Sequence, residues 1–158
     1  MSKSLRSTLF FFISIAAFSI YLWTRPPGPG PVVDPRLQPF LDEWQADVDR
    51  EGIDVRYPIG RLRSLKFGEI SSGFVGVSNK KDNTIVLSDR LIDQGEYVIR
   101  AAVYHELGHY VFDLKHVGYF SIMNSEVLRN WQYEDRWESM KNEYLNHCKE
   151  NYDIFKFR

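Results

Sequence analysis

One segment constrains the fold more than any other: residues 94–112, which offer almost no polar face to solvent. Its apolar side chains fall on nearly every side of a helix: Val98, Ile99, Ala102, Val103, Leu107, Tyr110 and Val111. A helix that is hydrophobic all round belongs inside a domain, because every face needs a partner. We therefore predict a central, buried helix around which the rest of the chain packs.

The same helix carries two histidines and a glutamate in the segment His105-Glu106-Leu107-Gly108-His109. Residues four apart lie about 40° apart around a helix axis and about one turn along it, so both imidazoles can reach one metal ion. Glu106 then lies beside the ion, where its carboxylate can hold and deprotonate water. The pattern predicts zinc ligands at His105 and His109 and a catalytic base at Glu106. Two ordinary core histidines with a solvent-facing glutamate are the alternative.

A catalytic zinc ion needs a third protein ligand and an open fourth position. His116 lies seven residues after His109, where the chain could leave the helix and turn back, and it is the predicted third ligand. Asp113 continues the four-residue spacing but lies about 12 Å from His105 along the axis. Glu126, Glu134 and Glu138 stay open as alternatives.

Met123, in Ser121-Ile122-Met123-Asn124, is the next residue of interest. A buried methionine near such a site can form an apolar floor beneath the ligating imidazoles. Simple core filling is a compatible interpretation of the same residue.

The stretch HELGHYVFDLKHVGYFSIMN resembles the metzincin group of zinc peptidases: two helical histidines, a third soon afterwards, then a turn bearing methionine. In the usual pattern the third histidine is six residues beyond the second, with a glycine between. Here position 115 is Lys, position 112 is Phe, and the histidine comes one residue later. That offset is similar to small bacterial and phage proteins of metallopeptidase type, which have HELGH, a later His and a SIM turn.

The resemblance implies a zincin-like α+β fold, with a small, mostly antiparallel sheet packed on the HExxH helix. The strand before that helix, residues 83–88, would then form the upper rim of the cleft. An exposed strand edge there could bind an extended peptide as an added strand, or be an ordinary edge.

Local patterns predict the other elements of this α+β fold. Residues 37–48 have helical spacing and Gly52 follows as a stop. Short β-branched and aromatic runs predict strands at residues 53–57, 65–70, 73–77 and 83–88. A last helix, residues 133–149, carries Trp137, Met140, Tyr144 and Cys148 on one side.

The N-terminal residues 1–24 predict a membrane anchor. The 18 residues between Arg6 and Arg25 carry no charge, Lys3 and Arg6 precede them, and Tyr21 and Trp23 lie at their far end. A signal peptide cleaved after Ala17-Phe18-Ser19 is the alternative, and either would export the following domain. Residues 25–36 hold five of the seven prolines and predict a linker without a helix or a strand ladder. The catalytic domain would span residues 37–158.

Composition limits the partners. A net charge of −1 with scattered Lys and Arg argues against nucleic acid, which needs a concentrated basic face. Cys148 is the only cysteine, so the chain forms no internal disulfide and its compartment is not decided by cysteine usage.

These features predict a zinc metallopeptidase that cleaves peptide bonds in a peptide or protein substrate, using a zinc-activated water and Glu106 as general base. Two other functions stay open: a non-catalytic, zinc-stabilised binding or assembly domain on a membrane tether, and a zinc amidase acting on a cell-wall amide. Glu106 argues against a purely structural site, which has no use for a base.

Overall fold

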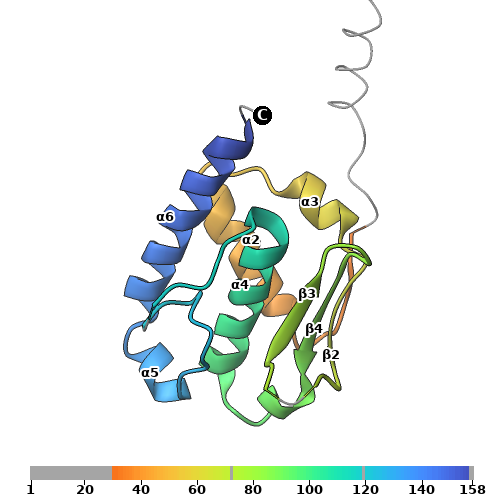
Figure 1. Ribbon diagram of the computed structural model, residues 1–158, viewed down its shortest axis with the longest axis vertical. Helices are drawn as coiled ribbons and strands as arrows, with labels where there is room; N and C mark the ends of the chain where they lie inside the picture. Colours follow the sequence, from red (N-terminus) through yellow and green to blue (C-terminus); the bar gives the residue numbers. More distant parts are fainter. Residues whose placement is uncertain (1–29, 72, 119, 157–158) are drawn as a thin grey trace, which may run out of the picture.

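The computed structural model describes residues 30–71, 73–118 and 120–156, which form an α+β arrangement (Figure 1). The strands in these residues are β1 Val32–Val33, β2 Ser64–Gly68, β3 Gly76–Asn79 and β4 Thr84–Ser88. The helices are α2 Gln38–Arg50, α3 Arg56–Arg61, α4 Glu96–Phe112, α5 Asn130–Glu134 and α6 Trp137–Lys156, with a short 3-10 helix, η1, at Asp89–Leu91.

Helix α4 is the centre of the packing, as predicted. It contacts β3 and β4 on one side and α2, α5 and α6 on the others, and Figure 1 shows it between the sheet and α6. Val103, Tyr104 and Leu107 are fully buried along it. The helix is therefore enclosed because none of its faces is polar enough for solvent.

The sheet is mixed rather than mostly antiparallel, so that expectation was wrong. Its strand order is β1-β2-β4-β3. β1 pairs parallel with β2 and β2 parallel with β4, and only β3 and β4 are antiparallel. The reason is connectivity: α2 and α3 carry the chain back between β1 and β2, whereas the short turn at residues 80–83 allows a hairpin only between β3 and β4.

β4 is an interior strand and β3 is the edge strand beside it, so the prediction that residues 83–88 form an exposed rim was also wrong. The hairpin places β4 between β2 and β3 and uses its backbone groups on both sides. The Ser88 N–H donates to the Val75 carbonyl at 2.8 Å. Antiparallel pairing alternates from there, which turns the backbone groups of Gly76 and Ser78 away from β4.

The helix predicted at residues 37–48 is confirmed by α2, whose buried side chains include Leu41, Trp44 and Val48. Pro39 lies in its first turn, where a missing N–H costs nothing. Gly52 follows with φ +75°, a conformation that glycine adopts without strain.

The strand predicted at residues 53–57 does not form. Ile53 and Val55 are buried, which explains the apolar pattern, but the Asp54 carboxylate accepts a hydrogen bond from the backbone N–H of Arg56 at 3.0 Å. Such a side-chain-to-backbone bond favours a turn over a strand, and α3 starts at Arg56.

The linker predicted at residues 25–36 contains a short strand, so the expectation that it holds no ladder was wrong. β1 pairs with β2 through Val32 N–H to the Arg63 carbonyl and Asp34 N–H to the Leu65 carbonyl, both 2.9 Å. Pro31 and Pro35 flank these donors without replacing them, and β1 is an edge strand, where proline is tolerated.

The C-terminal helix predicted at residues 133–149 is two helices. α5 ends at Glu134, and α6 begins at Trp137 and continues to Lys156. The predicted apolar side of the helix is confirmed, because Trp137, Met140, Tyr144 and Cys148 are all buried. Trp44 donates to the Tyr144 hydroxyl at 2.9 Å, and Tyr144 donates to the Tyr104 carbonyl of α4 at 2.8 Å.

The predicted N-terminal anchor, residues 1–24, lies outside the described residues, as do residues 25–29 of the predicted linker. Among the helices that the structure describes, none combines the length and the apolar character needed to span a bilayer.

Candidate metal centre

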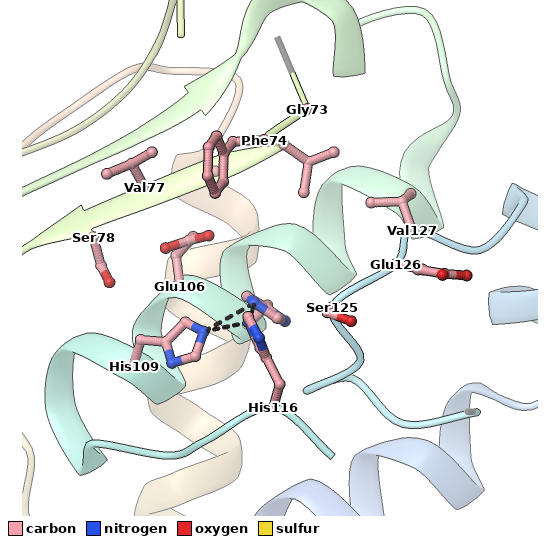
Figure 2. A pocket seen from close by; sticks show the side chains of 13 residues that line it. Gly73, Phe74, Val77, Ser78, Glu106, His109, His116, Ser125, Glu126 and Val127 are labelled. Carbon is pink, nitrogen blue, oxygen red and sulfur yellow. Dashed lines mark hydrogen bonds between the residues drawn. The ribbon is translucent and has the colours of Figure 1, made fainter. Parts of the chain in front are cut away.

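Three histidines converge at one point of the surface of α4 (Figure 2). The Nε2 atoms of His105 and His109 are 3.0 Å apart, those of His109 and His116 are 3.1 Å apart, and those of His116 and His105 are 3.3 Å apart. His105 and His109 come from successive turns of α4, and His116 follows the end of the helix. The structure thus brings together the three histidines that the sequence predicted as ligands.

Backbone carbonyls fix the two helical imidazoles. His105 Nδ1 lies 2.8 Å from the Ile122 carbonyl oxygen, and His109 Nδ1 lies 2.6 Å from the Leu114 carbonyl oxygen. A carbonyl only accepts hydrogen bonds, so each Nδ1 carries the proton and each neutral ring presents an unprotonated Nε2. This is the tautomer of a metal-ligating histidine whose other nitrogen is held by its surroundings.

A left-handed residue at the end of α4 brings His116 to its partners. Asp113 has φ +58°, and the Leu114 N–H donates to the Gly108 carbonyl at 3.2 Å, which closes the helix end. The chain therefore leaves the helix at Asp113, three residues before His116, and from this turn His116 reaches the other two histidines.

The donor set fits a zinc ion. The ligand atoms of a tetrahedral zinc site with bonds of 2.0–2.1 Å lie about 3.3 Å from one another, close to the three separations here. Burial lowers the pKa of His105 to about 4 and also lowers that of His109, so both rings are neutral near pH 7. Unprotonated nitrogens this close repel one another, and a shared cation relieves that repulsion.

Glu106 lies beside the three histidines and not among them. Its side chain is 4% exposed, and in Figure 2 its carboxylate lies between the histidines and β3. Burial raises its pKa to about 7, while hydrogen bonding from the side chain and backbone of Ser78 acts in the opposite direction. A carboxylate with a pKa near 7 can accept and return a proton at neutral pH.

Met123 is fully buried and packs against α4 at Gly108. A Cβ on Gly108 would lie 2.9 Å from the Met123 sulfur, so the glycine of HELGH leaves room for this side chain. The Val117 N–H donates to the Met123 carbonyl at 3.0 Å. The turn around Met123 therefore supports both His116, through Val117, and His105, through Ile122.

An open cleft of about 540 Å³ lies over the histidines. One wall is the segment from Gly73 to Ser78, which includes the β3 edge, and the facing wall is Ser125, Glu126 and Val127 (Figure 2). All three histidines and Glu106 line it, so the centre is reachable from solvent.

The alternative third ligands lie elsewhere in the described part of the chain. Glu126 lines the cleft outside the histidine cluster, and Glu138 pairs with Lys141 at 3.1 Å. Glu134 ends α5 and does not join the cluster. Asp113 pairs with Lys80 at 2.6 Å.

Sequence reasoning missed the residues that support the site. The carbonyls of Ile122 and Leu114 leave no signal in a sequence, since every residue has one. Gly76 and Ser78, which lie against Glu106, could be found only by knowing that β3 and not β4 is the edge strand.

Comparison with known proteins assigns no family: no protein-family model matches the chain, and neither does any curated protein or solved structure.

Proposed function

We propose that this chain is a zinc-dependent peptidase with a zincin-like fold. One observation carries the proposal: three Nε2 atoms lie 3.0–3.3 Å apart at the bottom of an open cleft, with the buried Glu106 carboxylate beside them. Three protein ligands with an accessible fourth side are typical of catalytic zinc, whereas structural zinc has four protein ligands.

The arrangement of the elements supports a zincin-like fold. A helix bearing two of the ligands packs beneath a small sheet, and the antiparallel edge strand β3 borders the cleft. The outward backbone groups of Gly76 and the outward carbonyl of Ser78 would hydrogen-bond an extended peptide as an added strand. This binding mode favours a peptide or protein over a small molecule as substrate.

His105, His109 and His116 would hold the ion. Zinc bound there would supply Lewis acidity, which activates water and polarises a carbonyl. Glu106 would accept the proton of the attacking water and deliver it to the leaving amine. Burial of Glu106 on the α4 surface keeps its carboxylate close to the reacting atoms and away from bulk solvent.

The N-terminal prediction also stays a proposal. Residues 1–24 would anchor the protein in a membrane with the catalytic domain exported, or would be removed as a signal peptide to release it. Export suits a peptidase that meets its substrates outside the cytoplasm.

The first test compares the purified wild-type chain with the variant Glu106→Gln. Both should bind one zinc ion per chain, measured by metal analysis, because Glu106 is not among the ligands. Glu106→Gln should lose on the order of a thousandfold or more in kcat on a peptide library, because an amide accepts no proton.

Wild-type-like turnover by Glu106→Gln would overturn the assignment of the base. Zinc binding without hydrolysis of peptides or amides by the wild type would favour a non-catalytic, zinc-stabilised domain. Cleavage of cell-wall amides alone would favour an amidase, which shares the same chemistry.

A further inference from the structure

The backbone conformation of residue 76 does not explain why this position holds a glycine. Gly52 and Gly95 have φ +75° and +105°, a conformation in which other residues are strained. Gly76 is an ordinary residue of β3 without a positive φ, so any amino acid could adopt its backbone. Something other than the backbone must exclude a side chain here.

The register of the sheet shows where a side chain at position 76 would point. Gly76 pairs with Leu87, and the next residue on the same face, Ser78, pairs with Ile85. Leu87 and Ile85 are both fully buried, so this face of the sheet is the one packed on α4. A side chain at position 76 would therefore point at α4.

On α4 the atoms at that point belong to Glu106. A Cβ on Gly76 would lie 2.7 Å from both Cγ and Cδ of Glu106 and would also overlap its Oε1. Real Cβ atoms essentially never come within 3.0 Å of such atoms, so Glu106 would have to move. The space that Glu106 occupies exists only because residue 76 has no side chain.

We propose that Gly76 is a positioning residue for Glu106: its missing side chain lets the carboxylate lie against β3, beside the three histidine nitrogens. The inference rests on the proposed role of Glu106 as general base. With alanine at position 76, the Glu106 carboxylate would have to leave β3, and the open cleft that it lines is the space into which it would shift. A shift of about 1 Å at a catalytic group can cost on the order of a hundredfold in rate.

The experiment is a double-mutant cycle with Gly76→Ala, Glu106→Ala and the double variant. Gly76→Ala should lower the melting temperature by about 3–10 °C, because displacing the Glu106 carboxylate from β3 gives up its hydrogen bonds from Ser78. In the Glu106→Ala background the same substitution should cost little, since the overlapping atoms are gone. If Gly76→Ala alone does not fold while the double variant does, the coupling is equally demonstrated.

Turnover supplies the second measurement. Gly76→Ala should keep the zinc affinity of the wild type in a chelator competition, and its kcat should fall about ten- to a hundredfold with little change in KM. Gly68→Ala, in β2, is the matched control: it adds a Cβ 3.1 Å from Val86 Cγ1 on the neighbouring strand β4, so it crowds the sheet without touching Glu106. The control should keep the wild-type kcat.

Equal stability losses from Gly76→Ala with and without the Glu106 side chain would overturn the inference. A kcat equal to that of the wild type would also overturn it. If the wild type itself cleaves no peptide, the proposed function fails, and the stability cycle still decides whether residue 76 sets the place of Glu106.

Discussion

His116 differs from the other two histidines because no helix holds it. His105 and His109 are anchored by α4 and by carbonyls, whereas His116 is exposed and depends on the turn at Asp113 and on the bridge between Val117 and Asn124. Replacing an exposed residue changes little of the core. The contribution of His116 to metal binding can therefore be measured with little effect on folding.

We expect His116→Ala to lower zinc affinity at least about a hundredfold, since it removes one of three protein ligands. The melting temperature of the metal-free protein should stay the same. Isothermal titration with zinc measures the affinity. The controls that should keep it are Glu126→Ala and His147→Ala, the second in α6 and outside the histidine cluster. Loss of affinity in Glu126→Ala but not in His116→Ala would assign the third ligand to the glutamate.

At the level of residues, the side chains with metal chemistry could be predicted and their supports could not. The spacing of His105 and His109 on a helix follows from helical geometry alone. His116 could be named because few donors follow the helix. Its exact path depends on the left-handed conformation of Asp113, and a sequence does not state which residue will take that conformation.

The end of α4 is the element on which the histidine cluster depends. Aspartate enters the left-handed region more readily than most residues, though less readily than glycine. Lys80, from the turn between β3 and β4, pairs with Asp113 and connects the sheet edge to the helix end. Both side chains are about half exposed, so the conformation of Asp113 should matter more than the ion pair.

Asp113→Val should therefore destabilise the protein by about 1–2 kcal/mol, because a β-branched residue resists the left-handed conformation. It should also weaken zinc binding by moving His116. Asp113→Gly should keep or slightly raise stability, since glycine adopts φ +58° without strain. Urea unfolding measures the stability of both variants. The variant Lys80→Ala measures the contribution of the ion pair alone. Equal losses in Asp113→Gly and Asp113→Val would show that the carboxylate matters and the backbone does not.

Helices and strands with a clear hydrophobic periodicity were predicted well, whereas the order and direction of the strands in the sheet were not. α2 and α4 follow from their apolar spacing, and β2 and β4 lie within two residues of their predicted bounds, whereas β3 begins three residues later than predicted. The sheet order could not be predicted, because a short apolar run does not indicate its neighbours or their direction. Residues 53–57 were mistaken for a strand because Ile53 and Val55 are buried in an irregular segment.

For the whole molecule, the core and the proposed metal site are largely separate. Buried apolar side chains from every helix and from two of the strands in the described residues, β2 and β4, surround α4. The histidines lie at one side of this core, under an open cleft. The fold should therefore form without metal, and a bound ion should add to its stability.

Zinc at about a hundred times its dissociation constant should stabilise the protein by about 2.7 kcal/mol, or roughly 10 °C in melting temperature. A chelator should reverse the shift while the far-ultraviolet circular dichroism stays that of a folded protein. Magnesium, which prefers oxygen ligands, should give no shift. Loss of the helical signal on chelation would instead show that the metal is required for folding.

The short sequence separation between His116 and the other ligands also determines how much a bound ion would reduce the conformational entropy of the unfolded chain. His105 and His116 are eleven residues apart, so an ion shared by them closes a small ring of backbone. The loop-closure free energy of so short a ring in the unfolded chain is only about 2 kcal/mol, apart from a constant that does not depend on length. The ion would act as a local cross-link, which opposes fraying at the end of α4 and places little constraint on the rest of the unfolded chain.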